Sequence, residues 1–365
     1  MVTTIPCALG LDTISQAEAD LANGWSLPYA WLGDPAMHAF EQGAIFERSW
    51  QVAGLERDVQ EPGSHITVRI GRMPVMVVRG RDGELRAFLN ICRHRGYPVA
   101  EGAGCRQLLV CRYHGWSYDL TGRLMAVPGA DAALQSQRDS LGLRPGAVSC
   151  WQGIVFVNVD AGAIPLRDTY PALDGLAARA GLDLPSYSHQ SRVDVDMACD
   201  WKLLYDNAAE CYHCPTIHGS SLNRMYASNG FFEGGWQDGV RYARATLTDG
   251  KRLHHSVQLF PGMLLFADPV IGLLGRIHPT EPGRSRFSVD YFSAPGADPG
   301  EAGDFIGLWT QTLREDSDLL ALQAIGAASG GIARGRLLMT REDSLPGVQA
   351  MILGAYRDAI IRQGQ

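Results

Sequence analysis

The sequence lacks the marks of several protein classes. No stretch of 18 consecutive apolar residues is present, so we expect no membrane-spanning helix. Lys and Arg form no long run and the net charge is −7, so the chain has no basic face of the kind that binds nucleic acid. The first residues include early acids and no positively charged start, unlike a secretory signal peptide. These absences predict a cytoplasmic protein whose partners include neither nucleic acid nor a membrane.

The composition is that of a folded protein. Of the 365 residues, 46% are hydrophobic and 19% are charged, which excludes a wholly disordered chain. This length allows two domains or one large domain, and no internal repeat or low-complexity tract is present. Eight cysteines in a chain without an export signal argue against a disulfide framework. Cysteines such as Cys92 and Cys111 stand close to histidines, which is the first indication of a metal.

The pattern of apolar residues changes twice along the chain. Helical spacing is found over 34–48, with Asp34 as N-cap and Pro35 at the first helical position, and again over 304–327 and 345–362. Short β-branched runs divided by Gly and Pro turns predict a small antiparallel β domain, and a second antiparallel sheet follows among later helices. We therefore predict an α+β fold with three parts: a helical lead-in that packs on the last domain (1–46), a β domain (47–160) and a larger domain (161–365).

Two short loops of the β domain carry one Cys and one His each. Cys92 and His94 form a C-x-H pair, and Cys111 and His114 form a C-x-x-H pair. Each pair lies in an expected turn after a strand, so the two loops can present four ligands to one site. Two thiolates and two imidazoles suit either a mononuclear zinc or a [2Fe–2S] cluster in which two His replace two Cys on one iron. Zinc fingers usually pair Cys with Cys and His with His, so this arrangement favours the cluster.

A second group of polar residues lies at the end of an expected helix over 201–214 and just beyond it. His213 and His218 are five residues apart, and on an unbroken helix their directions would differ by about 140°. Pro215 interrupts the helix between them, after which both imidazoles can turn toward one point. Two His and one carboxylate form the facial triad of non-haem Fe(II) enzymes, although two such histidines are also common as hydrogen-bonding groups at a helix end. A one-electron cluster in the same chain favours the iron, because the cluster needs an electron acceptor.

The residues around both groups resemble a known family. The stretches CRHRG and CRYHGWSYDLTGRL resemble the Rieske ferredoxin fold of Rieske-type non-haem iron oxygenases, and DNAAECYHCPTIH resembles their catalytic motif. The second motif is most similar to the branch that contains choline, glycine betaine and carnitine monooxygenases. The resemblance extends from about Leu27 to the C-terminus. Arg112 stands where the family usually has proline, a difference that leaves the four ligands in place.

The resemblance implies roles for individual residues. His213 and His218 are expected to bind a mononuclear iron. Glu210 is expected to hydrogen-bond to His213 and to bridge to a Rieske His of a neighbouring subunit, which would shorten the electron path. The third iron ligand is expected on a late helix, within a pair of acids. Asp316 matches this pattern best, and Asp318 is the alternative.

The neighbours of these ligands are expected to play supporting parts. Cys211 and Cys214 flank His213, and a thiolate there would compete for iron. Because the family motif carries cysteines here without ligation, we expect both to face the core. Asp206 and Asn207 are expected to support the site through hydrogen bonds.

The resemblance also implies the activity. The chain would be the terminal oxygenase of a Rieske system that takes electrons from a ferredoxin or a flavin-containing reductase. It would use NAD(P)H only through that partner, since no dinucleotide-binding fingerprint is present. Electrons would pass from the [2Fe–2S] cluster to Fe(II), which activates O₂ to hydroxylate a small organic substrate, including by N- or O-demethylation. The family further implies a homotrimer. An aromatic-ring hydroxylating dioxygenase, a Rieske electron carrier without oxygenase activity, and a zinc-binding interaction protein stay open as alternatives.

The sequence says least about the substrate. Quaternary ammonium ligands are bound by aromatic cages through cation–π contacts. Tyr205, Phe260 and Phe266 are candidates for the pocket. The aliphatic run LLFADPVIGLLGRIHP would suit an apolar or heterocyclic substrate, whereas Asp268 within it can pair with a cationic amine or sit in a turn before Pro269. We favour an amine or another small organic molecule over a bare arene.

Overall fold

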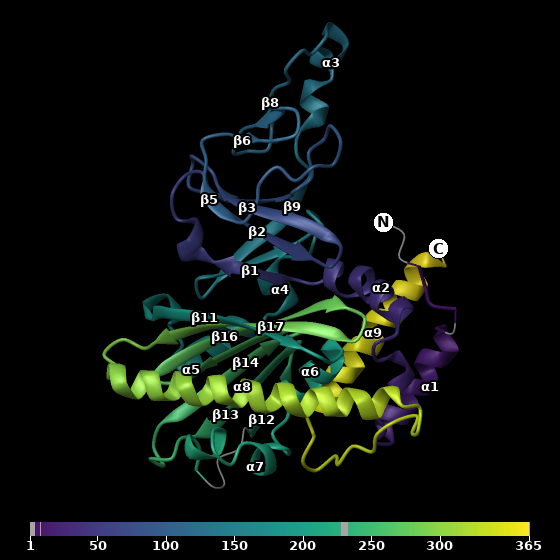
Figure 1. The fold of residues 1–365 in the computed structure, drawn as a ribbon, viewed down its shortest axis with the longest axis vertical. Helices are drawn as coiled ribbons and strands as arrows, with labels where there is room; N and C mark the ends of the chain where they lie inside the picture. Colours follow the sequence, from purple (N-terminus) through teal and green to yellow (C-terminus); the bar gives the residue numbers. More distant parts are fainter. Residues whose placement is uncertain (1–3, 8, 228–232, 365) are drawn as a thin grey trace. The chain divides into compact units, whose positions relative to one another are not determined.

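The computed structural model describes residues 4–7, 9–227 and 233–364. Contacts divide the chain into two compact units, which we call the smaller unit (Phe46–Asp168) and the larger unit (Met1–Ile45 with Thr169–Gln365) (Figure 1). The sequence places the second boundary near residue 160, and the structure places it later. Within the described residues, no helix combines the length and the apolar character needed to cross a membrane.

The smaller unit is built from antiparallel strands, as predicted. Seven of them form one sheet in the order β1-β10-β9-β4-β3-β2-β5, and three short strands form a second sheet in the order β6-β7-β8. The strands are β1 (Gln51–Leu55), β2 (Ser64–Ile70), β3 (Met73–Arg79), β4 (Leu85–Leu89), β5 (Ala103–Cys105), β6 (Leu109–Val110), β7 (Ser117–Tyr118), β8 (Leu124–Ala126), β9 (Pro145–Trp151) and β10 (Ile154–Asn158). A short helix, α3 (Ala132–Ser136), follows β8, and α4 (Leu166–Thr169) lies where the chain passes to the larger unit.

Strand β3 separates the two cores of the smaller unit. Successive side chains of a strand point to opposite faces, so Val75 and Val77 enter one core and Met76 and Val78 enter the other. All four are 1% exposed or less, which explains why this strand is a continuous apolar run. The core of Met76 and Val78 also contains Cys92 and Cys111, so the two loops that carry them rest on packed side chains.

The larger unit contains a second antiparallel sheet of seven strands. Its order is β11-β17-β16-β15-β14-β13-β12, so neighbours in the sheet are mostly neighbours in the chain. The strands are β11 (Ser188–Met197), β12 (Glu233–Gln237), β13 (Val240–Thr246), β14 (Leu253–Leu259), β15 (Met263–Ala267), β16 (Ile271–Glu281) and β17 (Arg284–Ser293). Every residue of the central strand β15 is buried. The combination of sheets and helices confirms the predicted α+β class.

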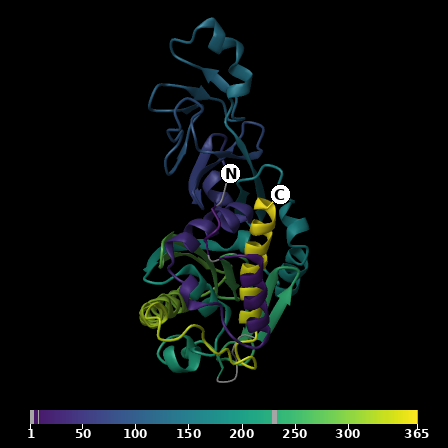
Figure 2. The ribbon, with the colours of Figure 1, turned by 90° about the vertical axis from the view of Figure 1, so that its right-hand side faces the viewer.

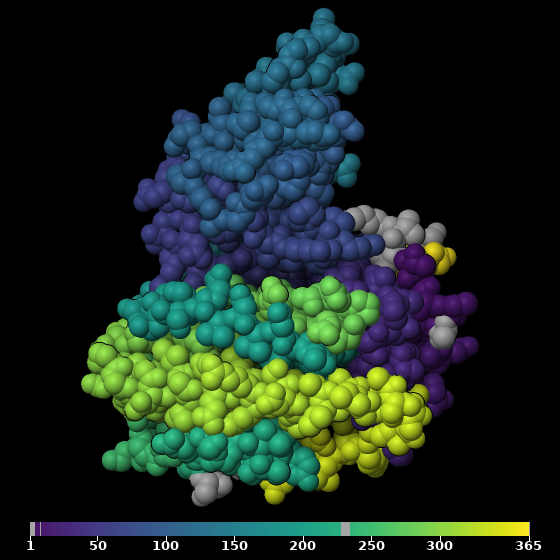
Figure 3. Space-filling view, in the orientation of Figure 1, coloured from purple at the N-terminus to yellow at the C-terminus, as the bar shows by residue number. Residues whose placement is uncertain are grey.

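Helices cover this sheet. The 30-residue helix α8 (Pro299–Ala328) packs on β11, β16 and β17 and forms a continuous band across the larger unit (Figures 1 and 3). The lead-in helices α1 (Leu11–Ala22) and α2 (Pro35–Ala44) pack on α9 (Leu345–Gln363), and α1 and α9 lie side by side in Figure 2. The short helix α5 (Leu173–Ala180) precedes β11. The predicted cap of α2 is confirmed, since the Asp34 side chain accepts a hydrogen bond from Met37 N at 2.7 Å and Pro35 is the first helical residue.

The helix expected over 201–214 is shorter than predicted. Helix α6 (Trp201–Ala209) ends before Glu210, whose backbone is extended, and a separate one-turn helix, α7 (Cys214–Ile217), follows. Pro215 stands in the first turn of α7, where its missing N–H is not needed, so it starts this helix rather than ending α6. The chain therefore turns twice, once at Glu210 and once after Ile217, and His213 and His218 lie at these two turns.

A buried ionic cluster anchors the start of α6. The Lys202 ammonium lies 2.6 Å from Glu41 Oε1 and 2.9 Å from Asp200 Oδ1. Trp201 Nε1 donates to Glu41 Oε2 at 2.7 Å, and Tyr356 donates to the same carboxylate. Glu41 belongs to α2 and Tyr356 to α9, so this cluster joins the lead-in and the C-terminal helix to α6.

Candidate functional site

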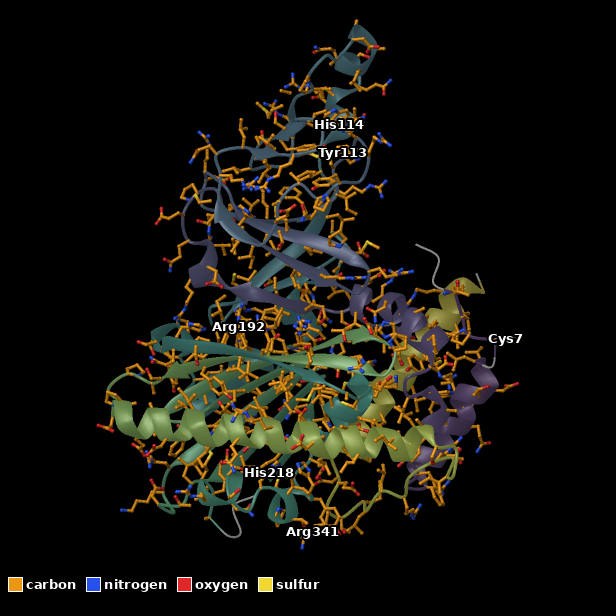
Figure 4. The ribbon with its side chains drawn as sticks, in the orientation of Figure 1. Cys7, Tyr113, His114, Arg192, His218 and Arg341 are labelled. Atoms are coloured by element: carbon orange, nitrogen blue, oxygen red, sulfur yellow. A yellow bond between two sulfur atoms is a disulfide. The ribbon has the colours of Figure 1, made fainter. Side chains whose placement is uncertain are left out.

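The smaller unit brings its two Cys–His loops together. The ring centroids of His94 and His114 are 4.6 Å apart. His114 is labelled in Figure 4. Both histidines are exposed, whereas Cys92 and Cys111 are buried at 3% and 2% exposure. The loops thus present two thiols from inside the domain and two imidazoles from its surface.

Both loops close in the same way. Gly96 N donates to Cys92 O and Gly115 N donates to Cys111 O, each at 3.0 Å. Both glycines have a positive φ, 77° and 73°, which side chains with a Cβ rarely adopt. Two equivalent turns therefore hold one Cys and one His each. This donor set fits a [2Fe–2S] cluster with Cys92 and Cys111 on one iron and the two histidines on the other.

The larger unit brings together the three expected ligands of a mononuclear metal. Asp316 Oδ1, on α8, lies 3.1 Å from His218 Nε2 and 3.5 Å from His213 Nε2. Two ligand atoms at about 2.1 Å from one ion and at right angles lie about 3.0 Å apart, so this spacing fits a single metal ion. Asp318, the alternative ligand, is an exposed residue of α8. Asn207 Nδ2 also approaches His213 Nε2, at 3.2 Å.

A carboxylate oxygen lies within hydrogen-bond distance of Nδ1 of each histidine. His213 Nδ1 lies 2.5 Å from Glu210 Oε1, and His218 Nδ1 lies 2.8 Å from Glu315 Oε2. When Nδ1 carries the proton that the carboxylate accepts, the Nε2 lone pair is directed to the metal. Burial alone would lower the pKa of His213, but hydrogen bonds to Asp316 and Glu210 raise it to about 9. In the sequence, Glu315 is marked only by its place in the pair of acids, and no role was expected for it.

Cys211 and Cys214 are not the unpaired, core-facing residues that we expected. The structure joins them by a disulfide, with their Cα atoms 5.0 Å apart. A separation of three residues across the turn that carries His213 places the two sulfurs within bonding reach. A disulfide sulfur is not a thiolate, so the candidate donors that meet here are two imidazoles and a carboxylate.

A cavity of about 70 Å³ adjoins these donors. Its walls come from α6, α8 and the facing strands of the sheet, and they are mostly apolar, including Leu264, Phe266, Leu273, Phe287, Trp309 and Leu313. Gly275 makes room for this wall, because a Cβ built there would lie 2.6 Å from the Phe287 ring. The size of the cavity thus depends on a glycine in the centre of β16.

The structure places one of the three pocket candidates at this cavity. Phe266 lines it, whereas Tyr205 and Phe260 are absent from its lining. Tyr205 is a fully buried residue whose ring packs toward Phe260, with the centroids 6.3 Å apart. Phe260 lies in the turn after β14, beyond the strand whose side chains face the cavity.

Asp268 does not face the cavity either. Its carboxylate lies 2.8 Å from His254 Nδ1 and accepts hydrogen bonds from Val270 N and Ile271 N. Of the two predictions for this residue, the turn before Pro269 describes the structure. Asp268 is therefore not available to pair with a cationic substrate.

Comparisons with known proteins match both units. The family described as Rieske [2Fe-2S] domain matches residues 49–145, and the catalytic domain of the ring hydroxylating alpha subunit matches residues 184–357. The glycine betaine monooxygenase oxygenase subunit of Chromohalobacter salexigens is 35% identical over 60% of this chain and 49% of its own length. The choline monooxygenase of Beta vulgaris is 33% identical over 52% of this chain and 44% of its own length. The chain spans about half the length of the curated relatives that it matches first.

Solved structures agree on the fold. A quaternary ammonium Rieske monooxygenase in complex with L-carnitine has a TM-score of 0.82 at 22% identity, over 93% of this chain and 98% of the other. A naphthalene 1,2-dioxygenase from Rhodococcus has a TM-score of 0.79 at 18% identity, over 95% and 98%. The resemblance found in the motifs is thereby confirmed. The chain belongs to the Rieske oxygenase α-subunit family, with a Rieske domain in the smaller unit and a ring-hydroxylating catalytic domain in the larger one.

Proposed function

We propose that this chain is the oxygenase component of a system that hydroxylates an N-methyl group of a quaternary ammonium compound, using O₂ and electrons from a separate reductase. The observation that carries the proposal is the meeting of His213, His218 and Asp316 at one wall of an apolar cavity. The named activities of the curated relatives, on glycine betaine, carnitine and choline, support the substrate class.

The donors of each centre fit the group that the family implies. Cys92, His94, Cys111 and His114 would hold a [2Fe–2S] cluster, and the three donors of the larger unit would hold Fe(II). When bound, the iron supplies the activation of O₂ and the cluster supplies electrons one at a time. We further propose a homotrimer in which Glu210 connects the iron site of one subunit to a Rieske histidine of the next.

The residues around the cavity would bind and orient the substrate. Phe266 and Trp309 lie with ring centroids 5.1 Å apart, and together with Phe287 they offer aromatic faces to a trimethylammonium group. Apart from the two ligand histidines, Arg241 is the cationic side chain on the described lining. Glycine betaine and carnitine are zwitterions, so Arg241 offers a place for a substrate carboxylate.

Two buried polar atoms favour such a substrate over a hydrocarbon. Gln258 Oε1 and Trp309 Nε1, both on residues of the lining, have no hydrogen-bond partner among the described residues. Leaving a buried polar group unsatisfied costs about 1–3 kcal/mol. The hydroxyl groups of carnitine and choline can donate to Gln258 Oε1 and accept from Trp309 Nε1. The carboxylate of glycine betaine can accept from Trp309 Nε1 alone, and a bare arene offers no comparable donor or acceptor. Ring dihydroxylation is the second candidate, because most of the lining is apolar.

The reaction has a definite balance. An N-methyl group, one O₂, two electrons and two protons give an N-hydroxymethyl group and one water. The hydroxymethyl group then loses formaldehyde and a proton, which leaves a tertiary amine. The amount of formaldehyde released should therefore equal the amount of O₂ consumed.

The test is turnover by the reconstituted protein. Chain loaded with iron and sulfide, and supplied with a surrogate reductase, should consume O₂ and release formaldehyde with glycine betaine, carnitine or choline. Oxygen uptake with naphthalene but not with these amines would replace demethylation by ring hydroxylation. A fully loaded protein whose cluster is reduced, but which consumes no O₂ with any of them, would leave only an electron carrier.

Glu210→Gln tests the proposed bridge. We expect this variant to retain both metals at full loading and to lose turnover, because an amide cannot hold the imidazoles of two centres as a carboxylate does. The measurement is metal content beside formaldehyde release. Turnover equal to that of the unchanged chain would refute the bridge.

A further inference from the structure

Glu315 is held more firmly than any other carboxylate at the mononuclear site. Ser221 Oγ donates to its Oε2 at 2.5 Å, and Ser220 Oγ and Gln311 Nε2 donate to its Oε1 at 3.2 and 2.8 Å. His218 Nδ1 completes the set at 2.8 Å from Oε2. By contrast, Glu210 has two described partners, Tyr212 N and His213 Nδ1.

These partners come from two separate parts of the chain. Ser220 and Ser221 follow His218 directly, whereas Gln311 lies one turn before Glu315 on α8. Gln311 Nε2 also donates to Ser220 Oγ at 2.8 Å, which closes the network. The carboxylate thus fastens the segment that carries His218, which is labelled in Figure 4, to the helix that carries Asp316.

Glu315 does not itself point to the metal. It contacts His218 at Nδ1, while Asp316 Oδ1 lies at Nε2 of the same ring. Neighbouring residues of a helix point about 100° apart, so two adjacent acids reach two different edges of one imidazole. His218 is only 1% exposed, so no water can replace Glu315 as the acceptor for Nδ1–H without a rearrangement.

We propose that Glu315 is a positioning residue for the mononuclear metal: it fixes the tautomer and the direction of His218 and sets its distance from Asp316. The inference rests on the proposed function in one respect, that a metal binds to His213, His218 and Asp316. A carboxylate on the outer nitrogen of a ligand histidine raises the basicity of the ligand and holds its ring, and its loss typically weakens metal binding 10- to 100-fold.

The experiment measures metal affinity without substrate or turnover. Chain with its Rieske cluster assembled is titrated anaerobically with Co(II), and the visible absorption of bound Co(II) reports both occupancy and ligand geometry. Glu315→Gln keeps the size of the side chain and removes its charge, and we expect the Co(II) dissociation constant to rise at least tenfold with an altered spectrum. Glu315→Asp, which keeps the charge but shortens the reach, should recover part of the loss.

Two controls separate this role from general damage. Asp318→Asn removes an exposed acid of the same helix and should leave the dissociation constant within twofold of the unchanged chain. Near-UV circular dichroism reports whether the larger unit, which contains Glu315, is folded, and the absorption of the Rieske cluster reports the same for the smaller unit. If Glu315→Gln is unfolded by either measure, Ser221→Ala decides the matter, because it removes one anchor of the carboxylate and should still weaken Co(II) binding several-fold.

The outcomes are distinct. The inference would be overturned if Glu315→Gln bound Co(II) with a dissociation constant within twofold of the unchanged chain and with the same spectrum. The same result for Ser221→Ala would overturn it where that variant decides. Either result would leave the proposed function standing. An unchanged chain that binds no Co(II), or binds it as well after His213→Ala, would instead overturn the metal site and with it both proposals.

Discussion

Replacing Lys202 by methionine should destabilise the larger unit more than any surface substitution. Lys202 is one of two lysines in the chain, and its side chain is 2% exposed. It stands between two carboxylates, Glu41 at 0% and Asp200 at 5% side-chain exposure. Methionine fills a similar volume but leaves both carboxylates without a cation.

The size of the effect follows from burial. Removing one partner of a buried ion pair costs about 3–5 kcal/mol, because the remaining charge stays desolvated. Glu41 retains hydrogen bonds from Trp201 and Tyr356, and Asp200 retains those from Gly33 N and Lys202 N, so the cost should not exceed this range. At about 0.05–0.15 kcal/mol of stability per residue, a loss of this size is a large part of the total.

The loss should also depend on pH. Burial raises the pKa of Glu41 above its ordinary value, and Lys202 opposes that shift. Without Lys202 the pKa of Glu41 rises further above its value in the unfolded chain. A group whose pKa is raised by folding takes up a proton more readily when folded, so its unfavourable contribution grows as pH rises. The variant should therefore lose more stability at pH 8 than at pH 5.5.

Urea unfolding, followed by tryptophan fluorescence at both pH values, measures this difference. Lys251→Met is the matched control, since Lys251 is exposed and should change stability by no more than about 0.5 kcal/mol. A loss below 1 kcal/mol for Lys202→Met at pH 8, or a loss that does not shrink at pH 5.5, would refute the reasoning.

Two further predictions concern the catalytic domain. In Gly275→Ala the new Cβ would lie 2.6 Å from the Phe287 ring, so the ring should move into the cavity and lower kcat/KM at least tenfold; unchanged kinetics would show that the ring has another place to go. Burial raises the pKa of Asp206 to about 7. The free energy of unfolding should therefore fall by up to about 4 kcal/mol as pH rises from 4 to 7, because the folded chain binds a proton that the unfolded chain has released. Asp206→Asn should flatten this slope in urea unfolding, and an unaltered slope would assign it to other groups.

Short-range chemistry in the sequence determined much of this protein. Two Cys–His pairs with fixed spacing, and two histidines around Pro215, indicated the two candidate donor groups, because members of a pair that are at most five residues apart stay close to each other whatever the rest of the chain does. The same holds for the Asp34 cap of α2, which depends on a neighbour three residues away. The alternation and turn residues were likewise sufficient for an antiparallel β domain and the α+β class.

Only the tertiary structure decided what depends on distant segments. Asp316 rather than Asp318 meets the histidines, and Glu315 holds His218, because the packing of α8 brings together residues that are about 100 positions apart in the chain. Phe266 rather than Phe260 lines the cavity, because Phe266 lies within a strand and Phe260 lies in a turn beyond a strand's end. Spacing along the sequence carries no information on such distances. Helix α6 ends at Ala209, and Gln258 Nε2 of the distant strand β14 donates to Ala208 O at 3.0 Å, a contact that the sequence alone does not reveal.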